Sequence, residues 1–273
     1  MAVNNFVLRT LSGLVLLVLV VGSILYSHIT MAALAVVIAA FSLHEFYTII
    51  SSERCRPASV YSTLVGVLTV VLFYLSISMQ APVLISFLVP LYMLLFFIEL
   101  FRKQEQPFIN IALSLGGLIY IALPLGLFTY LPFIEGSTQG YNPWVLLGVI
   151  FTVWGNDVGA YLVGVSIGRH KMFPRLSPKK SWEGFVGGVF FAILTSSLVA
   201  YFAGFDICKW AVLGLIISLT SVLGDLVESM LKRSLGIKDS GNSIPGHGGF
   251  LDRFDALILT IPFVYIYFII FTV

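Results

Sequence analysis

Residues 60–79 read VYSTLVGVLTVVLFYLSISM and contain no charged side chain. A helix crosses the bilayer core with about 20 predominantly apolar residues, so this stretch by itself predicts a transmembrane helix. The rest of the chain has the same character, because 59% of its 273 residues are hydrophobic, only 10% are charged, and the mean hydropathy is +1.02. Soluble domains carry about 25% charged residues. The composition therefore indicates an integral membrane protein.

Eight further apolar runs of similar length accompany residues 60–79. Lipid cannot satisfy backbone polar groups, so long unbroken runs of this kind are helices, and we expect an all-α polytopic membrane protein. The first run lacks a clear small-residue cleavage site, which favours a retained helix over a signal peptide. We expect one membrane unit, with helices one to five in residues 1–140 and helices six to nine, with the catalytic loops, in residues 141–273. The predicted spans are 11–27, 30–50, 60–79, 81–101, 111–131, 143–165, 184–204, 209–231 and 254–272.

Lysine and arginine side chains predict the orientation, because loops rich in them stay in the cytoplasm. Nine spans place fourteen of the fifteen basic residues on the face of the N-terminus, and only Lys209 on the other. We therefore expect a cytoplasmic N-terminus and an external C-terminus, with Cys55 and Cys208 on opposite faces and unable to pair. The basic face holds Arg9, Arg54, Arg56, Arg102, Lys103, Arg169, Lys171, Arg175, Lys179, Lys180, Lys232, Arg233, Lys238 and Arg253.

The loop after the sixth predicted helix reads GRHKMFPRLSPKKSWEGFVGG over residues 168–188. Ser177 and Pro178 have the residue types of a cap and first position for the seventh helix. Lys179 and Lys180 would then lie at a helix N-terminus, where the dipole disfavours cations unless an anion joins them. Phosphate binding would explain this placement, and a contact with anionic lipid is the simpler alternative.

Acidic residues inside apolar spans are costly in lipid and are candidates for function. Asp225 and Glu228 lie one turn apart on the eighth predicted helix, and Lys232 follows one turn later on the same face. An ion pair of Glu228 with Lys232 at the helix end is an equally good explanation for those two. On the sixth helix Asp157 lies too deep to reach the surface easily, and both it and Asn156 are candidates for function, whereas nearby glycines are better explained by close helix packing.

The last cytoplasmic loop ends in the sequence PGHGG over residues 245–249, followed by Asp252, Arg253 and Asp255. Glycines let the backbone approach a ligand and turn N–H groups toward phosphate oxygens. Asp252 and Asp255 can present two carboxylates on one helix face, and Mg²⁺ takes such oxygens when phosphates complete its shell. Together these features indicate metal-assisted phosphoryl chemistry, although HGG alone is usually only a flexible turn.

These residues resemble the signature of the phosphatidate cytidylyltransferases, also called CDP-diacylglycerol synthases. The segments WGNDVGAY (154–161) and SPKKSWEGFVGG (177–188) are similar to other blocks of that family. The resemblance implies transfer of the cytidylyl group of CTP to phosphatidate, giving CDP-diacylglycerol and pyrophosphate in phospholipid biosynthesis, with a divalent metal. The matching signature positions are Ser229, Lys232, Arg233, Lys238, Asp239, Pro245, His247, Gly248, Gly249, Asp252, Arg253 and Asp255.

The residue types suggest a role for each candidate. We expect Asp225, Asp252 and Asp255 to hold Mg²⁺, with room for a second cation, and basic groups to bind phosphates. His247 would donate to a phosphate oxygen or serve a structural purpose. The expected catalytic residues are Asp225, Lys232, Arg233, His247, Asp252, Arg253 and Asp255. The expected substrate-binding residues are Asn156, Asp157, Lys179, Lys180, Glu228, Ser229, Lys238, Asp239, Gly248 and Gly249.

The expected partners are CTP, phosphatidate and membrane lipids, without nucleic acid, and the small-residue helix faces would allow a homodimer. The chain length, without an N-terminal extension, favours a bacterial cytoplasmic membrane with the site facing the cytoplasm. Two alternatives stay open. A CTP-dependent lipid-alcohol kinase would share the basic loops but react at the γ-phosphorus, and an organic-ion transporter would also need intramembrane polar residues, usually between repeats with broken helices.

Overall fold

The computed structural model describes residues 2–134, 140–241, 243–244 and 248–272. Eight helical segments in this part of the chain are long and apolar enough to cross a membrane, and the apolar part of α1, Thr10–Tyr26, is a shorter ninth. The expectation of an all-α polytopic membrane protein is confirmed. The helices are α1 (Ala2–Tyr26), α2 (His28–Ile50), α3 (Ser59–Ser78), α4 (Val83–Ser86), α5 (Leu88–Arg102), α6 (Pro107–Gly117), α7 (Leu123–Tyr130), α8 (Pro143–Ile167), α9 (Trp182–Ala203), α10 (Ile207–Ser234) and α11 (Leu251–Thr272).

The chain divides into two compact units, which are described separately. The first consists of residues 1–130 and 239–254, and the second of residues 131–238 and 255–273. Residues 239–241, 243–244 and 248–250, in the loop between α10 and α11, therefore pack with the N-terminal helices, although most of their neighbours in sequence belong to the second unit. Both cysteines are free thiols, Cys55 in the first unit and Cys208 in the second.

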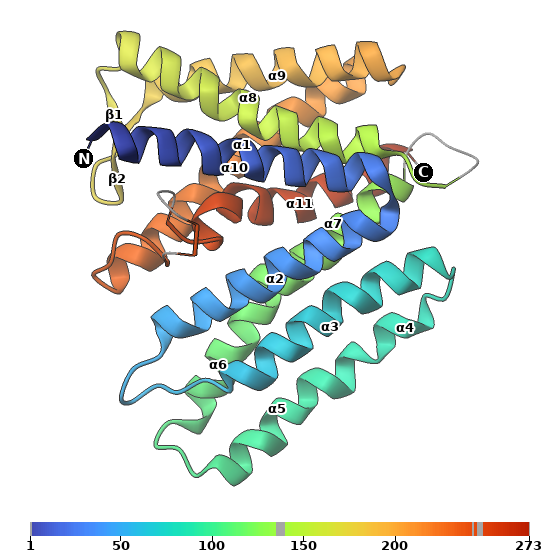
Figure 1. Ribbon diagram of the computed structural model, residues 1–273, viewed down its shortest axis with the longest axis vertical. Helices are drawn as coiled ribbons and strands as arrows, with labels where there is room; N and C mark the ends of the chain where they lie inside the picture. The colour runs from blue at the N-terminus through green and yellow to red at the C-terminus, as the bar shows by residue number, and fades with distance from the viewer. Residues whose placement is uncertain (1, 135–139, 242, 245–247, 273) are drawn as a thin grey trace. The chain divides into compact units, whose positions relative to one another are not determined.

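In the first unit, α3 packs against both α2 and α5 (Figure 1). Its core is apolar and closely packed, since a Cβ atom on Gly66 would lie 2.2 Å from Leu43 Cδ1. The span after α5 runs from α6 through a π-helical turn (η1, Leu118–Ala122), α7 and a short 3₁₀ turn (η2, Leu131–Phe133). Pro124 is the second residue of α7 and lacks the N–H that would bond to the carbonyl oxygen of Tyr120 in a regular α-helix, which accounts for the irregular turn.

In the second unit, α8 and α9 pack closely through glycines on both helices. A Cβ atom on Gly159 would lie 2.5 Å from Phe191 Cβ, and one on Gly187 would lie 2.4 Å from Val163. This confirms the expectation that the glycines of the sixth predicted span serve helix packing. Without side chains at these positions, the two helices approach closely over several turns.

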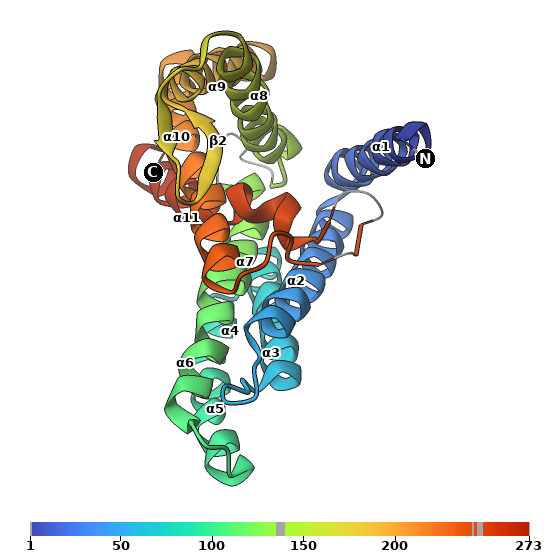
Figure 2. The same ribbon diagram turned by 90° about the vertical axis from the view of Figure 1, so that its left-hand side faces the viewer.

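A two-stranded antiparallel hairpin connects α8 to α9 and corrects the sequence interpretation. Strand β1 (Lys171–Phe173) pairs with β2 (Ser177–Ser181), with Lys171 opposite Ser181 (Figure 2). Helix α9 begins at Trp182, and Ser181 is its cap, accepting a hydrogen bond from Gly184 N at 3.2 Å. The predicted cap at Ser177 is wrong because that residue is the first of strand β2, where it pairs with Phe173. Lys179 and Lys180 therefore lie on an extended ribbon.

Candidate active site

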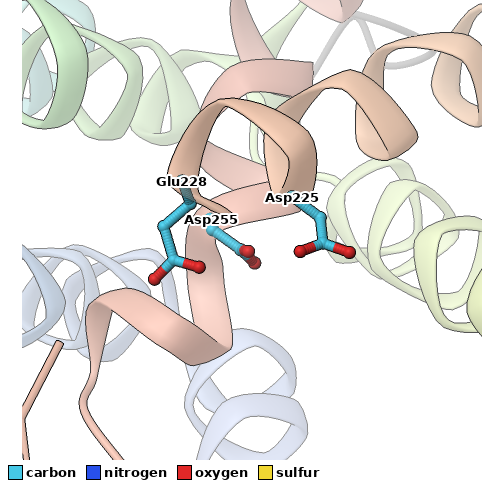
Figure 3. Close-up of side chains that lie close together, drawn as sticks. All are labelled: Asp225, Glu228 and Asp255. Atoms are coloured by element: carbon cyan, nitrogen blue, oxygen red, sulfur yellow. The ribbon is translucent and has the colours of Figure 1, made fainter. Parts of the chain in front are cut away.

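Three carboxylates of the second unit lie together where α10 meets α11. Gly224 makes this approach possible, since a Cβ atom there would lie 2.9 Å from both Ala256 Cα and the carbonyl oxygen of Asp255. Asp225 and Glu228 project from α10 and Asp255 from α11, and one oxygen from each lies within 4.8 Å of the others (Figure 3). Such a spacing suits a single bound cation.

We call these three carboxylates the acidic cluster. They differ in their exposure to solvent and in the charged groups beside them. Asp255 and Glu228 are 8% and 1% exposed, whereas 41% of the Asp225 side chain is open to solvent. Lys180 pairs with Asp225 at 2.6 Å, and Lys232 pairs with Glu228. Like charges this close repel each other strongly away from water, so the cluster requires ammonium groups or a metal cation to offset them.

A cavity of about 500 Å³ opens beside the acidic cluster, entirely within the second unit. This volume is within the range of small-molecule pockets. Asp225 lines it and is shared with the acidic cluster, and Asp157 on α8 lies on another wall. Lys171, Lys179 and Lys180 of the hairpin also line it. The pocket thus offers ammonium groups to an anion and carboxylates to a cation within one space.

The hairpin is fixed at its base by Glu183 in the first turn of α9. Its carboxylate accepts hydrogen bonds from the backbone N–H groups of Arg169 at 3.1 Å and His170 at 3.2 Å. The His170 ring nitrogen Nδ1 lies 2.5 Å from the same carboxylate. Glu183 therefore holds the start of the ribbon that carries the pocket lysines.

Asn156 and Asp157 are neighbours on α8 but have different surroundings. Asn156 is fully buried, accepts a hydrogen bond from Ser218 at 2.6 Å and donates to Ser221 at 3.2 Å. Both serines belong to α10, so this amide connects two helices of the second unit. Asp157 is exposed and faces the pocket. On α10, Ser229 lies one turn beyond Asp225, and its hydroxyl donates a hydrogen bond to the Asp225 carboxylate at 3.4 Å.

Asp252 has a different environment in the first unit. Its carboxylate accepts hydrogen bonds from the N–H groups of Ser240 at 3.0 Å and Gly249 at 2.9 Å. The Gly249 amide, which we expected to face a phosphate, is thus directed at Asp252. Gly248 has a φ of +87°, a conformation that L side chains rarely adopt, so the turn requires a glycine there.

The remaining candidates are mostly at the surface. Arg233 is exposed and donates to the carbonyl oxygen of Ile237 at 3.2 Å. Lys238, Asp239 and Arg253 are exposed as well. His247, together with the neighbouring Pro245, lies outside the described residues.

The structure also reveals site residues that the sequence interpretation missed. Lys171 lines the pocket, and Glu183 holds the hairpin. In the first unit, Glu45 is a buried carboxylate that contacts the loop between α10 and α11 and the first residue of α11. The available signal for Glu45 was an ionisable residue inside an apolar run, which is rare and usually has a purpose.

The fold and the site define an integral membrane protein whose pocket is lined by three lysine side chains and by Asp225 of the acidic cluster, an arrangement that suits an enzyme acting on phosphate groups. Residues 7–271 match the model of the cytidylyltransferase family. Proteins named phosphatidate cytidylyltransferase are similar over nearly the whole chain. The relative from Staphylococcus aureus (strain COL) is 32% identical over 262 residues, covering 93% of this chain and 95% of its own. The relative from Staphylococcus saprophyticus is 31% identical over 256 residues with the same coverage. This chain belongs to the cytidylyltransferase family.

Proposed function

We infer that this protein is a nucleotidyltransferase that transfers the cytidylyl group of CTP to phosphatidate, giving CDP-diacylglycerol and pyrophosphate in phospholipid biosynthesis. The observation that carries this is the pocket of the second unit, which is lined by three lysines and by Asp225 of the acidic cluster. Family membership and the similarity to phosphatidate cytidylyltransferases over 93% of the chain support it.

The reaction requires little covalent chemistry from the protein. Phosphatidate carries a phosphomonoester with a second pKa of about 6, so it is a nucleophile near neutral pH without help from serine or cysteine. One of its oxygens forms a bond to the α-phosphorus of CTP, while the bond from that phosphorus to the β-phosphate oxygen breaks. Pyrophosphate leaves with the electron pair. The protein must bring two anions together and neutralise their charge.

Lysine side chains of the hairpin are suited to bring the two anionic substrates together. Lys171, Lys179 and Lys180 line one pocket and can donate to the triphosphate or the lipid phosphate. Lys180 also pairs with Asp225, which connects the anion-binding wall to the acidic cluster. Asp157, on another wall of the pocket, is placed to accept a hydrogen bond from a bound ligand. Together they orient CTP and hold charge opposite the developing pyrophosphate.

The acidic cluster fits a divalent cation. Its three oxygens lie within 4.8 Å of one another, and hard carboxylate oxygens are the ligands that Mg²⁺ takes. We propose that Asp225, Glu228 and Asp255 hold Mg²⁺, with room for a second cation beside Asp157. When bound, Mg²⁺ would neutralise phosphate oxygens. Asp252 was also expected to be a ligand, and we now propose that it holds the last cytoplasmic loop, because its carboxylate accepts hydrogen bonds from two backbone N–H groups of that loop.

We also propose that the enzyme resides in a bacterial cytoplasmic membrane with its site facing the cytoplasm. The basic hairpin supports this orientation, since lysine-rich loops stay inside. Phosphatidate would then reach the pocket from the inner leaflet, with its acyl chains in lipid.

The deciding experiment follows label from CTP into chloroform-extractable lipid with purified protein. α-³²P CTP and γ-³²P CTP are run in parallel, with phosphatidate and Mg²⁺ present or omitted. We expect lipid label from the α position only, and only with both additions. Label from the γ position would indicate a lipid kinase. No lipid label from either, in preparations that are correctly folded, would favour transport, which a liposome flux assay would then measure.

A further inference from the structure

Glu45 is a buried carboxylate on α2 that no feature of the reaction requires directly. It is 5% exposed and lies in an apolar span, about 7.5 Å along the helix from Ile50, where that span ends. An ionised side chain is costly at such a position unless hydrogen bonds compensate for the lost water. The partners of Glu45 are therefore informative.

Four donors from the last cytoplasmic loop and the first residue of α11 converge on the two oxygens of Glu45. Ser243 Oγ donates at 2.6 Å and Ser240 Oγ at 3.3 Å. The backbone N–H groups of Phe250 and Leu251 each donate at 3.0 Å, one to each oxygen. A carboxylate that only accepts hydrogen bonds has the capacity for all four.

The two backbone contacts lie where α11 begins. The first N–H groups of a helix have no partner within the helix, and a negative charge there is favoured by the helix dipole. Helix α11 starts at Leu251, so Glu45 supplies its N-terminal cap from another helix, 206 residues away in sequence. The carboxylate of Asp252 accepts hydrogen bonds from the backbone N–H groups of Ser240 and Gly249. Two carboxylates thus fix where the loop ends and the helix starts.

The loop is shaped to accept this carboxylate. A Cβ atom on Gly249 would lie 2.4 Å from Glu45 Oε2, and one on Gly241 would lie 2.8 Å from Oε1. Any larger residue at either position would displace the carboxylate or the loop. Phe250 also stacks on Phe41 of α2, with ring centroids 4.7 Å apart. The contact is therefore specific and extends beyond one hydrogen bond.

We propose that Glu45 is a positioning residue, which holds residues 240–241, 243–244 and 248–250 of the last cytoplasmic loop in the conformation that binds substrate. This inference rests on the proposed cytidylyl transfer, because it is the signature residues of that loop that are positioned. Glu45 itself touches no substrate. Without Glu45, only a fraction of the molecules has the loop in its binding conformation. The apparent affinity for substrate is then the intrinsic affinity multiplied by that fraction.

The test compares Glu45→Gln with Glu99→Gln in the full-length protein. Glu99 is a matched control, since it is also buried in the first unit, at 3% exposure, but bonds to Arg102 and Asn110 at 2.7 and 2.6 Å. Hydrogen exchange followed by mass spectrometry measures the amides of residues 240–251. Steady-state assays measure kcat and KM for CTP and for phosphatidate.

We expect Glu45→Gln to speed loop exchange at least tenfold and to raise at least one KM at least fivefold, with a smaller change in kcat. Glu45→Asp keeps the charge on a shorter side chain and should restore part of both effects. Glu99→Gln should change neither the loop exchange nor the KM values. If Glu45→Gln does not fold, Ser243→Ala removes only the 2.6 Å bond and should give a smaller effect in the same direction.

The proposal would be overturned if Glu45→Gln and Glu99→Gln had the same rate of loop exchange and the same KM values. Faster exchange with unchanged KM values would overturn it as well, because the loop would then be held without consequence for binding. If the wild-type protein transferred no cytidylyl group, the proposed function would fail. The exchange data would then still decide whether Glu45 orders the loop.

Discussion

Replacing Gly224 with alanine should separate the carboxylates of the acidic cluster. The new Cβ atom would lie 2.9 Å from Ala256 Cα, whereas nonbonded carbon atoms rest about 3.5–4.0 Å apart. Both neighbouring atoms are backbone, so α11 must move by roughly 0.6 Å or more, and Asp255 with it. Such overpacking costs about 1–3 kcal/mol, against about 0.5–1 kcal/mol that alanine gains over glycine in a helix.

The assay for Gly224→Ala is the Mg²⁺ dependence of cytidylyl transfer together with thermal unfolding. We expect the half-saturating Mg²⁺ concentration to rise about tenfold or more, since displacements near 1 Å at a reacting site can cost about 100-fold. Tm should fall by a few degrees. The control is Gly116→Ala on α6, whose added Cβ would meet nothing within 4 Å and should leave Mg²⁺ dependence unchanged. Wild-type Mg²⁺ dependence in Gly224→Ala would refute the assignment of the cation to this cluster.

Three further outcomes are expected. Lys180→Ala removes the pocket ammonium that pairs with Asp225 and should raise KM for CTP at least tenfold, whereas Lys209→Ala should not, as initial-rate measurements would show. Asn156→Ala leaves the two serine hydroxyls of α10 without their amide partner and should lower the free energy of unfolding by about 1–3 kcal/mol in chemical denaturation. In single-cysteine variants, a membrane-impermeant maleimide should label Cys55 only in inside-out vesicles and Cys208 only in right-side-out vesicles, and labelling from one side would contradict the predicted orientation.

The membrane spans were predictable because each is a local property of composition. Twenty apolar residues need no knowledge of their neighbours to become a helix in lipid. The hairpin was not predictable in this way, because β2 exists only by pairing with β1. Ser177 and Ser181 are both good caps by residue type. Only strand pairing decides that the helix starts after the second.

The candidate site was partly predictable for a similar reason. The spacing of Asp225 and Glu228 on one helix follows from helical geometry, but which of them shares a site with Asp255 depends on how α10 and α11 pack at Gly224. The environment of Asp252 depends on a loop whose amides turn back onto it. Glu45 could not be assigned a role from sequence, because its partners lie about 195–206 positions away.

The pairing of Lys180 and Lys232 with the acidic cluster has a consequence for how the protein is made. Three carboxylates lie beside two ammonium groups, so the acidic cluster of a newly inserted chain has nearly balanced charges without any bound ion. Insertion and folding in the membrane therefore do not depend on a supply of the metal cation. We expect the apoprotein to insert, survive chelation and regain function when the cation returns.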